Sequence, residues 1–283
     1  MNNLTIDIMI PIFYKNELRK KITFLQLKYL LYIFNELKKK NILISLTVVG
    51  QPEYHSDIQK YLSFNKDNIF VIFNQNNYNI NYNLNFYHNN NLKKMLHNKI
   101  KKGLEISFKK EKDYSCFMGS NDFIHIDWFL SLKNNYILDE KQIIGIHKTT
   151  NNLKNYTFLY KLDEKIKIKN LKEVGIWDGN HKDELYKKYN NFSYFGAIIG
   201  FNKLSYNDIL NINNLWHEIQ IESNCIKNNY KNIKNNNCLY LNIKSGQDLT
   251  DSDKLFSIFK IKIIDEKIIN KKNDLLKLLD ELY

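Results

Sequence analysis

The sequence predicts an α/β protein whose central sheet is mostly parallel and flanked by helices, with a C-terminal elaboration. In the first half, short β-branched apolar runs alternate with longer segments whose apolar residues recur every three or four positions. One run, 42–49, is apolar almost throughout, as expected for a parallel strand covered on both faces. The chain has 283 residues, which is enough to bury the core of one large domain.

The elements follow from these patterns in chain order. Strands are predicted at 6–13, 42–49, 69–73 and 114–118, and helices at 18–40, 56–62 and 92–108. The Asn- and Tyr-rich segment 74–91 is predicted as a partly ordered loop. In the second half we expect strands at 143–146 and 256–264, mixed strand and loop at 161–177, a glycine-punctuated apolar stretch at 192–201, a helix at 215–228, and a terminal helix capped by Asn273 and Asp274. No linker or internal repeat is visible, so 1–283 is expected to be a single domain.

The charge of the chain allows two interpretations. The formal net charge is +12, which is typical of proteins that meet nucleic acid or an anionic surface. However, Arg19 is the only arginine, and the abundance of Asn, Lys, Ile and Tyr is what AT-rich codons produce. Both a solvated lysine surface and a functional anion-binding face therefore stay open.

Several classes of protein are disfavoured. The three cysteines are too few and too scattered for a disulfide framework or a zinc cluster, so they are expected to be buried and reduced. No signal peptide and no run of eighteen apolar residues is visible, so we expect a cytoplasmic protein without a transmembrane segment. Phosphate loops, dinucleotide fingerprints, nucleophile elbows and His-x-x-x-His zinc spacing are also absent from the sequence.

An acidic residue follows the fourth predicted strand. Asp122 comes just after Gly119, Ser120 and Asn121, at a position where α/β sheets bind ligands. A carboxylate there could hold a hard divalent cation, which prefers oxygen ligands. Alternatively, Asp122 caps a helix that begins near His125.

Two further features could carry chemistry. Glu218 and Glu222 follow Trp216 at a spacing that places both on one helical face, where either could be a general base or simply part of a solvated face. Gly196 and Gly200 punctuate a strongly apolar stretch, which would let a backbone approach a ligand, or would mark a bulge in a buried strand.

Taken in order, these motifs resemble a nucleotide-sugar glycosyltransferase of the GT-A fold, similar to family 2. The stretch from Ile8 to Tyr14, with Pro11 and Phe13, resembles the first strand and its donor-binding turn, and Val48-Val49-Gly50 resembles the second strand end. Ser120-Asn121-Asp122 stands where the family carries its Asp-x-Asp motif, with serine in place of the first acid. The apolar stretch around Gly196 resembles the acceptor border, and Trp216-His217-Glu218 resembles the motif that supplies the catalytic base.

The resemblance implies roles for these residues. Residues 1–125 would form the nucleotide-sugar-binding half, 126–230 the acceptor half, and 231–283 the C-terminal elaboration. Asp122 would hold Mn²⁺ or Mg²⁺ against the donor diphosphate, while Pro11, Phe13, Tyr14, Gly50, Ser120, Asn121 and Gly196 would line the donor site. Glu218, or Glu222 in another register, would deprotonate the acceptor hydroxyl in an inverting displacement.

The acceptor is left open by the sequence. A glycan or another cellular or surface molecule is one candidate, and a hydroxylated base in phage or viral DNA is another. For DNA, the lysine clusters at Lys99–Lys102 and Lys109–Lys112 would contact phosphates. A catalytically inactive binding module with a degenerate acidic motif is the non-enzymatic alternative. The oligomeric state is not indicated.

Overall fold

The computed structural model describes most of the chain. The described residues are 3–14, 16–63, 65–81, 88–137, 139–146, 154–162, 167–168, 171–177, 198–215, 221, 224–225, 227–236, 238–244 and 264–283.

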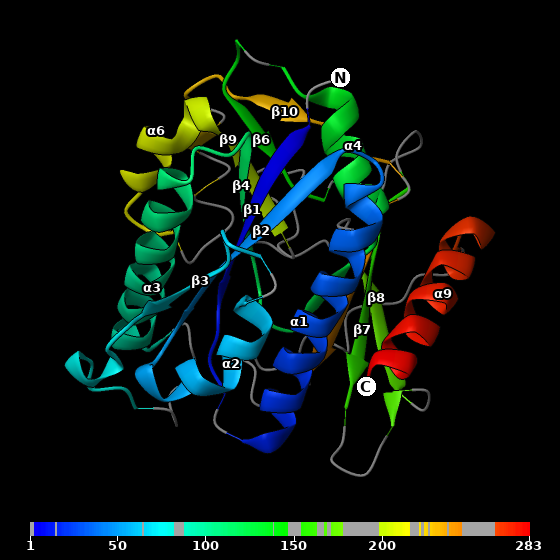
Figure 1. Cartoon of the computed structure of the whole chain (residues 1–283), viewed down its shortest axis with the longest axis horizontal. Coiled ribbons are helices and arrows are strands. Elements are labelled where there is room, and N and C mark those ends of the chain that lie inside the picture. Colours follow the sequence, from blue (N-terminus) through cyan, green and yellow to red (C-terminus); the bar gives the residue numbers. More distant parts are fainter. Residues whose placement is uncertain are drawn as a thin grey trace.

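A seven-stranded sheet forms the centre of the molecule (Figure 1). Its strand order is β10-β6-β9-β4-β1-β2-β3, and all neighbouring strands are parallel except at β9, which runs antiparallel to both β4 and β6. The strands are β1 (Leu4–Pro11), β2 (Ile42–Gly50), β3 (Ile69–Ile72), β4 (Tyr114–Met118), β6 (Gln142–Ile144), β9 (Ile198–Asn202) and β10 (Lys231–Ile233). The predicted α/β class with a mostly parallel, helix-flanked central sheet is therefore confirmed.

Helices cover both faces of this sheet. They are α1 (Glu17–Lys38), α2 (His55–Leu62), α3 (Asn90–Lys109), α4 (Asp127–Asn135) and α6 (Tyr206–Leu210), with short 3-10 turns at Pro52–Tyr54, Gln75–Asn77 and Lys203–Ser205. Successive side chains of a strand point to opposite faces. Accordingly, Ile8 and Ile10 pack in the core that includes α1, whereas Met9 between them packs in the core that includes α3.

A second sheet stands beside the first, with strand order β5-β11-β7-β8. It consists of β5 (Asp122–Ile124), β7 (Tyr156–Lys161), β8 (Lys172–Trp177) and β11 (Leu239–Lys244). The C-terminal helix α9 (Glu266–Leu282) lies alongside β7 and β8 in Figure 1, on the far side of the molecule from α3. The two sheets meet where the chain passes from β4 through residues 119–121 into β5.

Most of the predicted elements of the first half are confirmed, and the second half needs corrections. The terminal helix begins at Glu266, not after Asn273, because the side chain of Asp265 accepts a hydrogen bond from the Lys267 amide and caps it. The strand predicted at 143–146 is Gln142–Ile144. The predictions for 256–263, and most of those for 192–201 and 215–228, fall outside the described residues.

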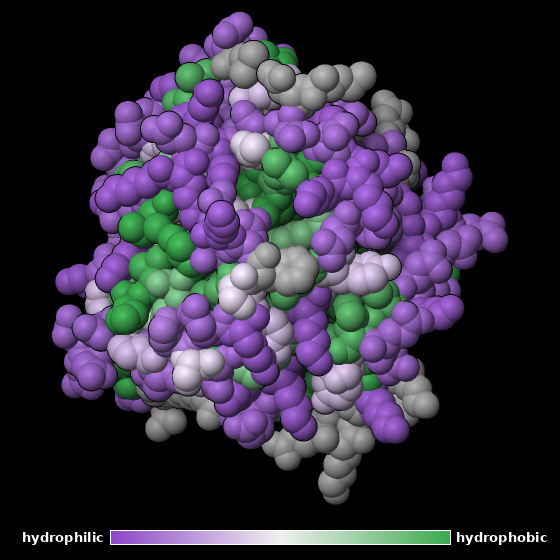
Figure 2. Space-filling model, in the orientation of Figure 1, coloured by the Kyte–Doolittle hydropathy of each residue, from purple (hydrophilic) through white to green (hydrophobic). Residues whose placement is uncertain are grey.

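Two further predictions concern the cysteines and membrane-spanning segments. Cys116, Cys225 and Cys238 are buried and are not joined in disulfides, as expected. No helix in the described ranges combines the length and the apolar character needed to cross a bilayer. Hydrophilic side chains cover most of the face shown in Figure 2, with apolar ones in separate patches.

Asp7 of β1 and Lys110, at the end of α3, form a buried ion pair. The carboxylate of Asp7 is fully buried and accepts hydrogen bonds from Ser45, Thr47 and the Lys110 ammonium, each at 2.6 Å. Lys110 also donates to the Leu46 carbonyl at 3.0 Å. Burial lowers the pKa of Lys110, although the nearby Asp7 carboxylate opposes this shift. The pair therefore fixes the end of α3 against the sheet.

We predict that Lys110→Met destabilises the fold by about 3–5 kcal/mol, because it leaves the Asp7 carboxylate buried without its counter-charge. Urea unfolding followed by circular dichroism measures this free energy. The matched control is Lys109→Met, which removes an exposed lysine from the same helical turn and should change stability by less than about 1 kcal/mol. Equal stability of the two variants would contradict the role given to the pair.

Candidate functional site

The carboxyl ends of β1, β2 and β4 meet at one edge of the central sheet. All three strands are parallel, so the residues that follow them share this edge. The Ile12 amide donates to the Val49 carbonyl at 2.8 Å, and the Phe73 amide donates to the Gly50 carbonyl at 2.8 Å. One edge of the sheet therefore brings together most of the predicted donor-site residues and Asp122. The donor-site residues there are Pro11, Phe13, Tyr14, Gly50, Ser120 and Asn121.

The turn of residues 119–122 is fixed from two sides. From α1, the buried Gln26 amide donates to the main-chain carbonyls of Gly119 and Asp122, the latter at 2.7 Å. From β11, the Ile243 amide donates to the Asn121 carbonyl at 3.1 Å, and the Asn121 side chain donates back to the Ile243 carbonyl at 3.1 Å. The turn is therefore a rigid element and not a loose surface loop.

Asp122 opens strand β5 and does not cap a helix. The helix α4 begins at Asp127, and its N-cap residue is Ile126, so the capping alternative for Asp122 is wrong. Its side chain is buried, and one carboxylate oxygen accepts a hydrogen bond from the Asn242 amide. The other oxygen lies too close to the position of a Cβ atom on residue 119, so any residue larger than glycine there would have to displace this carboxylate.

Arg19 lies at the same turn, which sequence reasoning did not foresee. It occupies the first turn of α1, where the Asn16 side chain caps the helix by accepting from the Arg19 amide at 2.8 Å. Its Nη2 atom donates to Ser120 Oγ at 3.1 Å and to Asn121 Oδ1 at 3.0 Å. The available signal was that the chain's only arginine stands at the start of the helix after the first strand.

Aromatic side chains form the other part of the edge. The Tyr14 ring stacks on the Tyr54 ring with centroids 4.1 Å apart, and Tyr54 Oη donates to the Tyr14 carbonyl at 3.0 Å. Tyr14 Oη donates to the Asp57 carboxylate at 3.3 Å. Burial and the charge of Asp57 raise the pKa of Tyr14, so this phenol stays neutral at physiological pH. Tyr54 is buried and Tyr14 is partly exposed, so Tyr14 is the member of the pair on which a nucleobase could stack.

A buried lysine supports the turn after β1. Lys99 of α3 is 1% exposed, and its Nζ atom donates to the Ile12 carbonyl at 2.9 Å, between the rings of Phe13 and Phe73. Burial lowers the pKa of Lys99 to about 8. Because Lys99 is buried, its ammonium does not face solvent, and it stabilises the turn through the Ile12 carbonyl.

The lysines proposed to contact DNA need correction. Lys99 is buried, and Lys110 binds the buried Asp7. Lys102 donates to the Ile72 carbonyl at 2.6 Å, and Lys112 forms an ion pair with Asp67. Four of the six lysines in these two clusters therefore bind to the protein itself, whereas Lys109 is exposed.

The donor set for a metal ion is poor at this turn. The oxygens of Ser120 and Asn121, which would complete a site with Asp122, already accept hydrogen bonds from a guanidinium cation. A divalent cation on the same oxygens would be repelled by that charge. Within the described ranges, no three His, Cys, Asp or Glu side chains are grouped so that they could hold a metal ion. Ser120 and Asn121 are therefore unsuited to bind a metal ion through the oxygens that contact Arg19. That Asp122 binds a divalent cation stays a prediction.

Three predicted site residues cannot be placed. Glu218, Glu222 and Gly196 lie outside the described residues, so their predicted roles as general base and acceptor border stay predictions.

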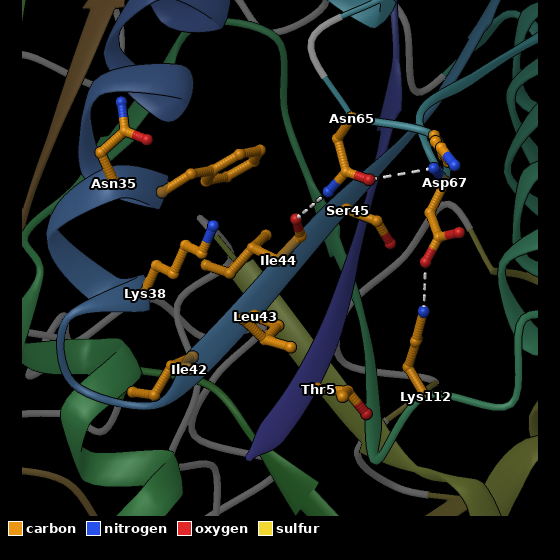
Figure 3. Close-up of a pocket in the computed structure, with 12 residues that line it drawn as sticks. Thr5, Asn35, Lys38, Ile42, Leu43, Ile44, Ser45, Asn65, Asp67 and Lys112 are labelled. Carbon is orange, nitrogen blue, oxygen red and sulfur yellow. Dashed lines mark hydrogen bonds and ion pairs between the residues drawn. The ribbon is translucent and has the colours of Figure 1, made fainter.

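A cavity of about 410 Å³ lies at the opposite end of the sheet (Figure 3). Thr5 and residues 42–45, at the amino ends of β1 and β2, form its floor, and Asn35 and Lys38 of α1 stand beside it. Asn65 and Asp67 line the other side, where Asp67 pairs with Lys112. Since this cavity is at the amino ends of the strands, it is separate from the candidate site.

We predict that Gln26→Leu costs about 1–3 kcal/mol of stability, because it removes the donor to two main-chain carbonyls of the 119–122 turn. Thermal and urea unfolding measure the loss. Gln59→Leu, at an exposed position of α2, is the matched control. If Gln26→Leu is no less stable than the control, α1 does not fix this turn.

Comparison with known proteins gives likenesses of fold. No protein-family model matches the chain, and no curated protein matches its sequence. Among solved structures, it is similar to a nucleotide-diphospho-sugar transferase from Desulfovibrio desulfuricans G20, with 11% identity, TM-score 0.39, and 99% of each chain covered. It is also similar to 4-diphosphocytidyl-2C-methyl-D-erythritol synthase from Anaerococcus prevotii, with 12% identity, TM-score 0.42, and 96% of each chain covered.

A third similar structure is S. aureus TarS 1–349, with 10% identity and TM-score 0.40, where 86% of this chain and 58% of that chain are covered. At such low identities and TM-scores, the activity of this chain has to be inferred from its own residues.

Proposed function

We propose that this protein is a glycosyltransferase that moves a sugar from a nucleoside diphosphate sugar to an acceptor hydroxyl. One observation carries the proposal. The turn after β1, the end of β2 and the 119–122 turn, which are distant in sequence and each resemble a donor-site motif of the GT-A family, lie together at one sheet edge. This edge is where open α/β sheets bind ligands.

The residues present suggest how the donor is held. The partly exposed ring of Tyr14, backed by the buried ring of Tyr54, is the surface for the base, and the main chain at Gly50 supports the edge beside it. The 119–122 turn, fixed by Gln26 and Asn242, stands where the phosphates would lie. Because these groups are held before the donor arrives, little conformational entropy is lost on binding.

The proposed chemistry is a direct displacement at the anomeric carbon. The acceptor oxygen forms a bond to that carbon as the bond to the diphosphate oxygen breaks, and the electron pair leaves with the diphosphate. Glu218, or Glu222 in its place, takes the acceptor proton. Attack opposite the leaving group inverts the anomeric centre.

A glycan or another cellular hydroxyl compound is the acceptor we favour. The DNA alternative required free lysine clusters, and Lys99 and Lys110 are engaged inside the protein. A test of transfer to hydroxymethylated DNA belongs beside the glycan assay, and transfer to DNA alone would overturn this choice.

The proposal is tested by a thermal-shift panel of nucleoside diphosphate sugars, nucleoside diphosphates and nucleoside triphosphates, with and without Mn²⁺. Stabilisation by one diphosphate sugar, followed by its slow hydrolysis or transfer, supports a glycosyltransferase. Binding without turnover supports the inactive binding module. Selective stabilisation by a triphosphate, with release of pyrophosphate, would indicate nucleotidyl transfer and contradict the proposal.

We predict that Glu218→Gln lowers the rate of sugar transfer about 10²- to 10⁴-fold with donor affinity largely kept, because the amide cannot accept the acceptor proton. Steady-state kinetics with saturating donor measure the effect. Glu222→Gln is the matched variant one helical turn away. If Glu222→Gln shows the large loss and Glu218→Gln is mild, the base is Glu222.

A further inference from the structure

Arg19, the only arginine of this chain, contacts Ser120, which stands where the resembled family has the first acid of its Asp-x-Asp motif. We infer that Arg19 binds the diphosphate of the donor and supplies the positive charge for its departure, so that transfer needs no divalent cation. The inference rests on the proposed function and concerns how the same site handles phosphate charge.

Arg19 is held in place from two directions. Its main-chain amide donates to Asn16 Oδ1, which fixes the first turn of α1. Its Nη2 atom bridges Ser120 Oγ and Asn121 Oδ1 at 3.1 and 3.0 Å. Those two residues belong to the turn that Gln26 and β11 hold, so the guanidinium is fixed at the position where the phosphates are proposed to lie.

The substitution at residue 120 agrees with a cationic side chain here. An acidic residue at 120 would add a second carboxylate beside Asp122, as a metal site requires. Ser120 instead has a neutral hydroxyl, which accepts a hydrogen bond from Arg19. The carboxylate of Asp122 is buried and accepts a hydrogen bond from Asn242 on the neighbouring strand β11. The positive charge at this turn is therefore supplied by the protein.

An arginine suits this task better than the lysines nearby. A planar guanidinium binds phosphate through two parallel N–H donors, whereas an ammonium acts as a point charge. Two neighbouring lysines also have other roles, since Lys99 is buried against the Ile12 carbonyl and Lys20 pairs with Asp57 at 2.7 Å. In a chain whose other cations are all lysine, the single arginine lies at the site where bidentate recognition matters.

The role in the reaction is electrostatic. As the bond between the anomeric carbon and the diphosphate oxygen breaks, negative charge grows on the departing diphosphate. Arg19 donates hydrogen bonds to it and stabilises that charge, while the acceptor proton goes to the carboxylate base and no electrons are exchanged with a cofactor. Arg19 binds the donor's phosphates, so it would be a catalytic residue.

The test is calorimetric titration of the protein with a nucleoside diphosphate chosen from the panel, in EDTA and in MnCl₂. Ligand-observed NMR with the matching nucleoside, which has no phosphate, reports base binding alone. The variants are Arg19→Gln and Arg19→Lys, and the matched control is Lys21→Gln, an exposed lysine of the same helix. Circular dichroism checks that each variant is folded.

We expect wild type and Lys21→Gln to bind the diphosphate equally well in EDTA and in MnCl₂. Arg19→Gln should bind it about 10- to 100-fold more weakly, with nucleoside binding unchanged, because only the charged hydrogen bonds are lost. Arg19→Lys should lie between the two, and it decides the matter if Arg19→Gln does not fold.

Two different failures can be told apart. If wild type binds the diphosphate only with MnCl₂, and the Arg19 variants bind like Lys21→Gln, the inference about Arg19 is wrong while the proposed function stands. If wild type binds no nucleoside diphosphate in either buffer, the proposed function itself is contradicted.

Discussion

The candidate site depends on the hydrogen bonds from Gln26 to the carbonyls of Gly119 and Asp122. They fix the turn at which the chain leaves the central sheet and enters the second one. Gln26 and Arg19 lie two helical turns apart, on the same face of α1. Helix α1 therefore binds the 119–122 turn in two ways. Gln26 contacts the main chain of the turn, and the Arg19 guanidinium contacts the side chains of Ser120 and Asn121.

Much of the positive charge near the sheet stabilises the protein itself. Lys110 neutralises Asp7 inside the core, and Lys99 holds the carbonyl that follows β1. Buried ions of this kind are tolerated because each finds partners that replace water. Four of the six lysines in the two candidate clusters contact other parts of the protein, so these clusters offer less free positive charge than the sequence indicates.

Local patterns explain which parts of the structure could be predicted. The helix after β1 and the strands at 42–50 and 114–118 follow from the spacing of apolar residues within each segment. The pairing of β5 with β11 joins residues far apart in sequence, so the role of Asn242 beside Asp122 had no local signal. Asn273 and Asp274 resemble a helix start, yet Asp265 caps the helix and Ile268 is already buried in it.

At the candidate site, the placement of the segments was predictable from the sequence, but the contacts of their side chains were not. The resemblance implied that the segments ending at Tyr14, Gly50 and Asp122 belong to one site, and the parallel pairing of β1 with β2 and β4 brings these segments to one edge of the sheet. What each side chain does there depends on contacts across the fold. The engagement of Ser120 and Asn121 by Arg19 joins the start of one helix to the turn after a distant strand, which no periodicity in the sequence encodes.

The central claim is that a nucleoside diphosphate binds at the carboxyl edge of the sheet. Hydrogen–deuterium exchange, measured with and without the nucleoside diphosphate that stabilises the protein most, tests it directly. Binding at this edge should slow exchange in peptides covering 11–20, 50–54 and 118–122, with 35–45 and 65–67 unchanged. Protection confined to 35–45 and 65–67, which line the cavity at the opposite end of the sheet, would contradict it.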